Sequence, residues 1–485
     1  MRDYHAGETA GSTAAILIPD AEMLAAIANT FANCFKIPEL KSRIIFTLVV
    51  LGICRVIAVI PVPGIDGVAL ANYFATNATR TGGGLLGMYS MFTGGALEHC
   101  ALGALGIMPY ISATIIIQLL TAVIPRLSKL AREEGGRPKL IQYGRYLTVL
   151  LCLGQGLFVA MQWENPAGMY PNFSGKLVMY TAGYIWWYRI QTVIMLTTAT
   201  MLLMWLGEQI TERGIGNGVS LVISIGIIAR LPQAFQALVD MFRAQVEKGG
   251  NFNIFIFHAI AMVALLVAVV AGVIAITQAQ RKIPVQHAQR AVGRKIYAGQ
   301  TSYMPLRVNF AGVMPVIFAQ AILMFPQKLF FQAGQLWNMK FLGQIAAWLA
   351  EGHFFYLTLY GAMILFFSYF WVATQFNEIQ IADDLKKHGG YIPGVRPGQA
   401  TSAYLHNAMS RITLAGAIFL TVIAVIPIVL YRFMSVPYPV ATFFGGTSIL
   451  ILIGVMLDTM RQMESHLLMR HYDGFLKKGR IRGRF

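Results

Sequence analysis

The residues of this sequence best suited to binding chemistry are cations gathered in one loop. Six basic residues follow the apolar segment 254–277 and precede the apolar run 310–325, with no acidic residue among them. They are Arg281, Lys282, Arg290, Arg294, Lys295 and Arg307. Because segment 254–277 is long enough to cross a bilayer, we expect a cationic hairpin at the membrane surface, where it attracts an anionic partner.

Residues that would suit a metal site are scattered along the chain. Glu98-His99-Cys100 is the one local group of possible ligands, and it lacks a fourth ligand nearby, so chance adjacency is the better interpretation. The cysteines form no CxxC pair, and we expect them to be small buried apolar residues. They are Cys34, Cys54, Cys100 and Cys152.

Nucleotide chemistry lacks its usual residues as well. The sequence has no GxxxxGKS/T phosphate loop. The glycine-rich stretch 214–218 follows a predicted helix and has no preceding strand, so we interpret it as a flexible cytoplasmic hinge. We predict that the chain is not an enzyme and holds no cofactor.

Arg55 is the clearest ionisable residue inside an apolar segment. A charge near the bilayer centre costs about 2.5–3.5 kcal/mol on insertion scales, and such residues usually mark transport chemistry. No acidic residue lies at mid-span to pair with Arg55 or to relay protons, so ion-coupled transport loses support. We expect Arg55 to be structural and to donate hydrogen bonds to backbone carbonyls.

Membrane-spanning helices must position these residues. Of the 485 residues, 56% are hydrophobic and only 12% are charged, which is too little charge to cover a soluble protein of this size. Apolar runs of about 20 residues recur along the chain, and a helix of that length crosses a hydrocarbon core about 30 Å thick. The predicted spans are 43–61, 103–124, 141–162, 190–206, 217–232, 254–277, 309–327, 354–375, 412–431 and 440–457.

The loops determine the orientation. Ten spans place both termini on one side, and the excess of Lys and Arg in the short loops of that side identifies it as cytoplasmic. The net charge of +17 is therefore mostly a topology signal. Two halves of five spans, joined near 233–253, would have opposite orientations, as an inverted repeat requires.

Three segments do not fit simple spans. The Gly-rich segment 82–101 is apolar but short, so we expect a re-entrant segment enclosed by protein or beside a water-filled cavity. Residues 20–41 contain an amphipathic stretch suited to the cytoplasmic surface. Residues 163–188 are rich in Tyr and Trp, which indicates an interfacial loop or belt.

One face of the second span is rich in isoleucine. Helical spacing places Ile107, Ile111 and Ile115 together. Such a face serves helix packing or lipid contact, or else forms an apolar ring that gates a pore by excluding water.

Six motifs in the chain carry a family resemblance. One is the run GALGIMPYISATIIIQLLT at 103–121, and the others are IPVPGID at 60–66, EQITERGIGNG at 208–218, AGQTSYMPLRVNFAGVMPVIFA at 298–319, ADDLKKHGGYIPGVRPG at 382–398 and FGGTSILI at 444–451. In their order along the chain they resemble the SecY family, the central subunit of the bacterial protein-conducting channel, and the run at 103–121 resembles its second span. Residues 1–40, 163–188 and the end of the tail lie outside the resemblance.

The resemblance implies an all-α polytopic membrane protein. Its ten transmembrane helices would form two pseudo-symmetric five-helix halves around an hourglass pore that opens across the membrane and sideways into lipid. The family's constricting apolar ring corresponds to Ile107, Ile111, Val219, Ile223, Ile317 and Ile451. Val219 departs from the commoner Ile by one methylene, which should leave a dry seal intact.

The resemblance also implies a plug and a lateral gate. The plug, a short helix that seals the outer funnel, corresponds to about 85–96, inside segment 82–101. Its apolar residues are Leu85, Leu86, Met88, Tyr89, Met91 and Phe92. The gate would lie between the second and third spans on one side and the seventh and eighth on the other, with Asn309 and Gln155 as polar lining residues.

Two cytoplasmic loops resemble the family's docking loops. Arg294 and Lys295 lie at the tip of the first, and Arg396 lies on the second. Neutralising the phosphates of ribosomal RNA releases counterions and gives salt-sensitive binding, and Arg can hold a phosphate or carboxylate bidentately. The alternative for each cation is a solvated topology determinant, which applies at least equally to Arg281 and Lys282.

The predicted organisation has four parts: a cytoplasmic N-terminal segment (1–42), a first half (43–250), a second half (251–458) and a basic cytoplasmic tail (459–485). The docking loops occupy about 279–308 and 377–411. We expect both termini in the cytoplasm and the protein in the bacterial plasma (inner) membrane.

The expected function is a passive channel subunit. It would translocate unfolded secretory polypeptides and release transmembrane segments sideways into the bilayer, driven by a ribosome or a SecA-like motor ATPase. Small SecE- and SecG-like membrane subunits, signal sequences of secretory preproteins and membrane lipids are the other expected partners. A solute transporter would need polar groups at the midplane, and few are present. A membrane scaffold would not need the re-entrant segment, and an intramembrane enzyme lacks paired carboxylates.

Overall fold

A computed structural model of the chain describes most of the segment from residue 37 to residue 478. The described residues are 37–76, 90, 93–133, 135–166, 173, 175–180, 182–247, 252–287, 290–292, 295–297, 301–336, 339–350, 353–433, 440 and 447–478.

Each of the ten predicted spans overlaps a helix. In chain order, the helices are α2 (Pro38–Ile57), α6 (Met108–Val123), α8 (Gly136–Glu164), α9 (Ile185–Arg213), α10 (Gly218–Ala229), α12 (Phe252–Gln278), α13 (Met314–Leu336), α15 (Phe354–Gln375), α17 (Gln399–Phe433) and α19 (Thr447–Lys478). Seven stretches of the described chain are long and apolar enough to cross a membrane, and they contain every helix of this set except α2, α13 and α19.

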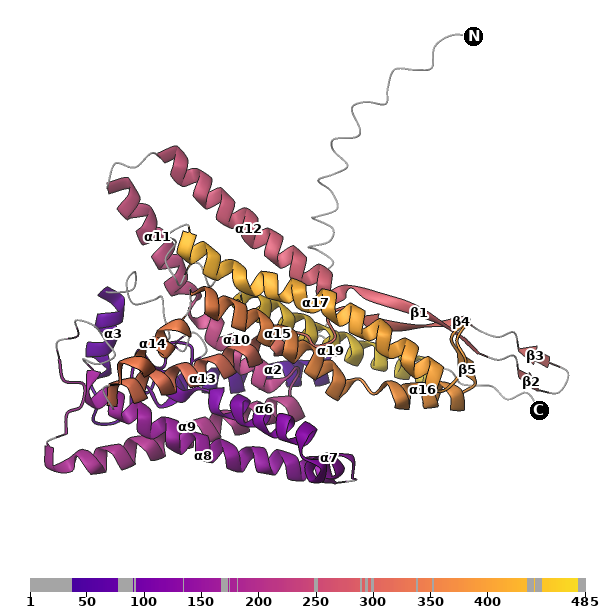
Figure 1. The fold of residues 1–485 in the computed structure, drawn as a ribbon, viewed down its shortest axis with the longest axis horizontal. Helices are drawn as coiled ribbons and strands as arrows, with labels where there is room; N and C mark the ends of the chain where they lie inside the picture. The colour runs from indigo at the N-terminus through magenta and orange to yellow at the C-terminus, as the bar shows by residue number, and fades with distance from the viewer. Residues whose placement is uncertain are drawn as a thin grey trace, which may run out of the picture.

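Shorter elements connect these helices. They are α3 (Gly67–Thr76), η1 (Leu102–Leu105), α7 (Pro125–Arg132), η3 (Ala182–Tyr184), α11 (Leu231–Glu247), α14 (Lys340–Trp348) and α16 (Glu378–Lys387). Figure 1 shows the long helices running along the longest dimension of the molecule, with α3 and α14 at one end and α7 and α16 at the other.

Local signals at the helix starts agree with their positions in the chain. Helices α2, α6 and α7 each carry a proline in the first turn, where its missing N–H costs nothing. The side chain of Asn217 caps α10 by accepting a hydrogen bond from the Ser220 N–H at 3.3 Å. Asn377 caps α16 in the same way, through the Gln380 N–H at 3.2 Å.

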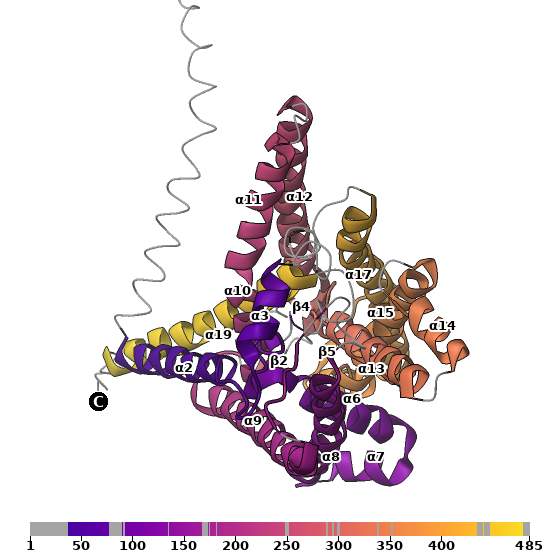
Figure 2. The same cartoon turned by 90° about the vertical axis from the view of Figure 1, so that its left-hand side faces the viewer.

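The two halves of the chain meet through particular helices. Within the first half, α8 and α9 pack together, and α10 contacts both α2 and α9. Within the second half, α15 packs between α13 and α17. Across the halves, α6 contacts α13 and α10 contacts α19. Figure 2, which looks along the bundle, shows α6 and α13 next to each other.

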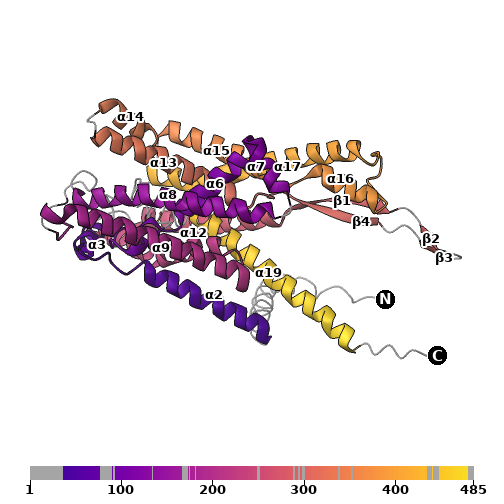
Figure 3. The ribbon, with the colours of Figure 1, turned by 90° about the horizontal axis from the view of Figure 1, so that it is seen from below.

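A sheet projects from the end of the bundle that carries α16. Strand β1 (Gln280–His287) pairs antiparallel with β4 (Thr301–Arg307), and β5 (Gly390–Tyr391) pairs with the other edge of β1. Beyond them, β2 (Arg290–Val292) and β3 (Lys295–Tyr297) form a small hairpin. Sequence analysis predicted loops here without strands. Figure 3 shows α16 beside this projection.

A separate hydrophobic cluster holds the projection to the bundle. Side chains alternate along β1, so that Ile283 and Val285 are buried while their neighbours are exposed. Ile283 packs with Leu306 of β4 and Leu405 of α17 in a cluster that also includes Val372, Phe376, Ile392, Ala408, Met409 and Ile412. The two predicted docking loops therefore form one folded unit, which we call the docking unit: residues 279–287, 301–308 and 377–411.

The glycine-rich stretch 214–218 is held in place, which differs from the predicted flexible hinge. The Ile215 N–H donates to Thr47 Oγ1 at 3.1 Å, and the Gly216 N–H donates to Gln462 Oε1 at 2.8 Å. A Cβ on Gly218 would lie 1.8 Å from the Gly207 carbonyl oxygen. Glycine is needed here for close packing of α9 against α10, because no side chain fits between them.

Candidate functional site

The six predicted ring residues belong to one buried apolar cluster. Ile107, Ile111, Ile223, Ile317 and Ile451 are 1–5% exposed, and the partly buried Val219 packs against the same cluster. They come from the start of α6 and from α10, α13 and α19. Two of the contacts between the halves, α6 with α13 and α10 with α19, involve these four helices.

Glycines set the positions of two ring residues. At Gly207 on α9, an added Cβ would lie 3.8 Å from Ile107 Cδ1 and 3.6 Å from the Val219 nitrogen. Gly106 has a φ of +57°, which turns the chain just before Ile107 and Pro109 begin α6. Small residues thus bring α6, α9 and α10 close together.

The six predicted ring residues have aliphatic side chains, which neither donate nor accept hydrogen bonds. A pore narrowed by such side chains would remove the hydration of an entering ion without compensation. The same side chains offer non-directional contacts to any polypeptide segment.

The predicted plug residues lie outside the described residues. These are Leu85, Leu86, Met88, Tyr89, Met91 and Phe92. The part of segment 82–101 that is described ends in a bridge to the chain after α2: the Val62 N–H donates to the Cys100 carbonyl at 2.9 Å, and the Leu102 N–H donates to the Ile60 carbonyl at 2.8 Å.

Segment 82–101 also contributes to a buried polar cluster. Glu98 forms an ion pair with Arg230, at the end of α10, and accepts a hydrogen bond from Ser90 Oγ at 2.6 Å. Arg55 donates from Nη1 to the Gly94 carbonyl at 2.8 Å, which confirms the prediction that this arginine bonds to backbone.

The ion pair of Glu98 was not predicted from the sequence. Glu98-His99-Cys100 was considered only as a metal site and was interpreted as chance adjacency, whereas the structure pairs Glu98 with an arginine 132 residues away. The signals in the sequence were a single carboxylate in an apolar Gly-rich segment and an arginine, Arg230, inside a predicted span. Neither signal identifies the other, because nothing local connects them.

The predicted gate residues lie on different elements, one in the turn before α13 and one on α8. Asn309 is 8% exposed and precedes α13, and Gln155 is partly buried on α8. Among the described residues no hydrogen bond joins the two. Helices α6 and α13 do contact each other. Gln320 on α13, a polar residue that was not singled out from the sequence, is buried, and its Oε1 has no hydrogen-bond partner among the residues that the structure describes.

The predicted docking residues differ in how much of them is described. Arg294 lies outside the described residues, and for Lys295, which begins β3, only the backbone is described. Arg396 is exposed, and its carbonyl accepts a hydrogen bond from Thr401 Oγ1 at 2.9 Å. Gly394 and Gly398, with φ of +81° and +107°, form turns on either side of it.

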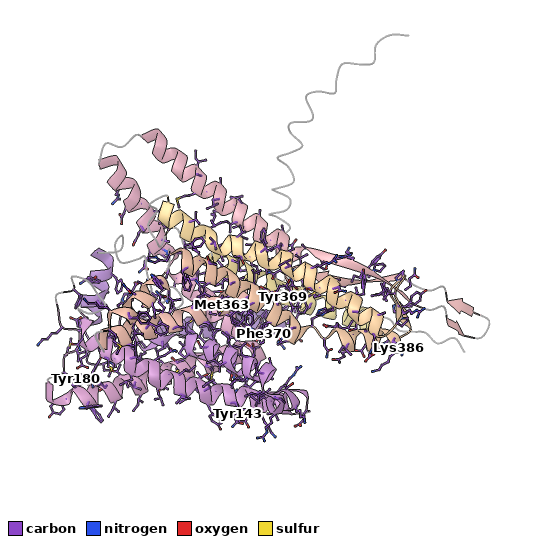
Figure 4. The ribbon with its side chains drawn as sticks, in the orientation of Figure 1. Tyr143, Tyr180, Met363, Tyr369, Phe370 and Lys386 are labelled. Carbon is purple, nitrogen blue, oxygen red and sulfur yellow. The ribbon has the colours of Figure 1, made fainter. Side chains whose placement is uncertain are left out.

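The exposed cations on and near the projecting sheet face away from the bundle core. Arg281 and Lys282 are exposed on β1. In Figure 4, Lys386 lies near the projecting sheet and Tyr180 near the opposite end of the bundle, with Met363, Tyr369 and Phe370 between them. The end of the molecule that carries the docking unit is therefore cationic over an ordered scaffold.

Comparisons with known proteins agree on one family. The SecY family model matches residues 101–460. The chain is 41% identical over 464 residues to the protein translocase subunit SecY of Chlamydia trachomatis, covering 94% of this chain and 99% of that one. It is 41% identical over 449 residues to the same subunit of Escherichia coli K12, covering 92% and 96%.

Solved structures share the fold at lower identity. A protein-conducting channel structure matches with a TM-score of 0.59 and 17% identity, covering 93% of this chain and 99% of that one. A SecY structure, reported with a plug domain that stabilises its closed state, has a TM-score of 0.58 and 18% identity over 91% and 94% of the two chains. Sec61 in the canine ribosome–channel complex has a TM-score of 0.56 and 17% identity, covering 91% and 94%.

Proposed function

The chain belongs to the SecY family, and on that basis we propose how it passes a polypeptide across a membrane. It is a multi-pass membrane protein with the ten-helix SecY fold. It is a protein-conducting channel subunit that translocates secretory proteins, and it is not an enzyme. The proposals below concern which residues perform each part of that function.

We propose that Ile107, Ile111, Val219, Ile223, Ile317 and Ile451 form the constriction. The observation that supports this is their burial in, or packing against, one apolar core from four helices, of which α6 contacts α13 and α10 contacts α19 across the halves. Aliphatic side chains exclude water while no peptide is present, and they release a moving chain without breaking specific bonds.

The contact between α6 and α13 is the proposed lateral gate. An apolar signal segment of about 7–15 residues would separate these helices and partition toward lipid, driven by burial of its apolar surface. Asn309, Gln155 and Gln320 would supply polar contacts at the gate. Among the described residues Gln320 Oε1 has no hydrogen-bond partner, so no bond to it must break when the helices separate. Segment 82–101 would seal the channel as its plug, and residues 43–250 and 251–458 would move as the two halves.

We propose that the docking unit binds an anionic partner that supplies the energy. Ribosomal RNA or an acidic surface of a SecA-like motor suits the exposed Arg396, because a guanidinium can bind a phosphate or carboxylate bidentately. Membership of the family implies translocon partners. SecE- and SecG-like subunits, a bacterial inner membrane and cytoplasmic termini complete the proposal.

A photo-crosslinking residue at Ile111 tests the constriction. Membranes that carry a stalled secretory protein should yield adducts to the nascent chain, and deletion of its signal sequence should remove them. The matched control is Ile116 on the same helix, whose side chain is 37% exposed and should capture lipid instead. Capture of lipid or helices alone at Ile111, with ribosomes still bound, would make the chain a docking platform.

A further inference from the structure

Glu98 is a buried carboxylate that the proposed path of the polypeptide does not use. Its side chain is 11% exposed, and that of its partner Arg230 is 17% exposed. The carboxylate oxygen Oε1 both pairs with the Arg230 guanidinium and accepts the hydrogen bond from Ser90 Oγ. One oxygen thus joins two points of segment 82–101 to α10.

The partner of Glu98 lies at the end of a helix that carries two of the proposed ring residues. Arg230 follows α10 directly and occupies its C-cap. The carbonyl end of a helix favours a cation, so the position stabilises the guanidinium independently of Glu98. Because α10 also holds Val219 and Ile223, the ion pair connects the root of the proposed plug to the helix of the proposed constriction.

A second arginine holds the same segment. Arg55 Nη1 donates to the Gly94 carbonyl, and a Cβ on Gly94 would lie 2.9 Å from Gly226 Cα of α10. Arg230 pairs with Glu98, and Arg55 holds the same segment through the Gly94 carbonyl. Loss of the Glu98 carboxylate would therefore leave the Arg230 guanidinium without its counter-charge.

We propose that Glu98, Arg230 and Arg55 are positioning residues that hold the closed plug against α10. The strength of their contacts then sets how strongly a signal sequence must bind before the channel opens. This inference rests on the proposed function, because it assumes that segment 82–101 seals the pore. We call the contacts of these three residues the latch, and the Glu98 carboxylate is its central group. When the plug leaves, the charges enter a wetter funnel in which water solvates them, so the open state is accessible.

The first test is Glu98→Gln in the full translocon, reconstituted into planar bilayers. Loss of the buried counter-charge should raise the resting ion conductance about tenfold, which corresponds to a modest shift in the closed–open equilibrium. In cells the same variant should export a reporter that carries a defective signal sequence. The matched control is Glu164→Gln, which breaks the Arg189–Glu164 ion pair (2.8 Å, side chains 20% and 18% exposed) between α8 and α9.

A double variant separates charge from packing. Glu98→Gln combined with Arg230→Met removes both partners, and replacing a buried ion pair with apolar groups is often tolerated. It should therefore conduct less than Glu98→Gln alone. Equal or greater conductance would overturn the latch, as would a control variant that leaks as much as Glu98→Gln.

Deletion of residues 85–92 distinguishes failure of the latch from failure of the proposed function. If the deletion leaks and Glu98→Gln does not, the latch is wrong and the plug assignment stands. If neither leaks, segment 82–101 is not the seal, and the inference fails with the plug assignment. Leakage in both variants, with a tight control, supports the latch.

Discussion

At the scale of single residues, glycines matter as much as larger residues, because they let helices approach closely. Gly207 and Gly218 allow α9 and α10 to touch, since a Cβ on Gly218 would lie 1.8 Å from the Gly207 carbonyl oxygen. Val219 and Ile107 both lie beside Gly207, where Ile107 belongs to the apolar cluster and Val219 packs against it. Among the polar residues, Arg55 binds a backbone carbonyl and Glu98 pairs with a guanidinium.

Gly218→Ala should destabilise the protein. The methyl group has no space against the Gly207 carbonyl, so α10 must shift, and we expect a cost at or above the about 1–3 kcal/mol usual for overpacking. Thermal unfolding of the detergent-solubilised complex measures it. Gly154→Ala on α8 is the control, because its Cβ meets nothing within 4 Å and alanine favours a helix by about 0.5–1 kcal/mol. Equal effects of the two substitutions would contradict the close approach.

Arg396→Ala should weaken binding of ribosomes or of the motor ATPase to proteoliposomes. If its guanidinium neutralises one phosphate, the slope of log affinity against log salt should fall by about one. The control is Lys387→Ala in the same unit, whose side chain is 74% exposed beside Asp384. Equal losses at both positions would indicate general surface charge and not a specific contact.

At the scale of elements, the docking unit is a small folded body with its own core. Strand β5 comes from the second docking loop and pairs with β1 of the first, while α16 and α17 supply apolar side chains beneath the sheet. The Val308 N–H, bonded to the Ala279 carbonyl at 2.9 Å, closes the base of the hairpin just before Asn309 and α13. Only a short turn therefore separates the hairpin from the proposed gate helix α13, so a displacement of the hairpin would be transmitted to that helix.

Ile283→Ala should loosen both docking loops at once. Its side chain is 2% exposed within the cluster, and truncation of a buried isoleucine costs about 2–5 kcal/mol. Limited proteolysis of sealed inverted vesicles should show faster cleavage in both 279–308 and 377–411. Ile379→Ala is the control, because Ile379 is 65% exposed on α16. Faster cleavage confined to the first loop would show that the two loops do not share a core.

At the scale of the whole molecule, the halves are joined by apolar contacts and by at least one hydrogen bond, from the Gly216 N–H to Gln462, which we call the polar clasp. Helices α6 and α13 meet at the proposed gate, and α10 meets α19. On the side of the docking unit, the Gly216 N–H donates to Gln462 Oε1 on α19, which links the two halves. Arg461, the adjacent residue on α19, donates to the Thr277 carbonyl at the end of α12.

Gln462→Ala should weaken this clasp. A partly buried N–H that loses its partner costs about 1–3 kcal/mol, so the two halves should separate more readily on this side. Hydrogen exchange of the intact complex should become faster at 214–218. The control is Ser465→Ala, since the Ser465 hydroxyl donates to the Gln462 carbonyl of its own helix and, in the described part of the chain, to no residue of the other half. Unchanged exchange at 214–218 would show that apolar contacts alone hold the halves.

The sequence was sufficient for features that depend on nearby residues. The spans follow from apolar length, because the bilayer demands about 20 residues of each helix. Prolines in the first turn and asparagine caps agree with several helix starts, and the backbone role of Arg55 followed from the lack of an acidic partner. The family followed from six ordered motifs. These signals are local, so they can be read without knowing the fold.

Packing decided the features that join distant residues. Glu98 meets Arg230 across 132 residues, β5 completes a sheet begun at Gln280, and the glycines at 214–218 proved to be packed and bonded and not a flexible hinge. No periodicity encodes such pairs, because each depends on how whole helices settle against one another. For the same reason, helical spacing grouped Ile107 with Ile111, but only the contacts of α6, α10, α13 and α19 gather the other apolar residues around them.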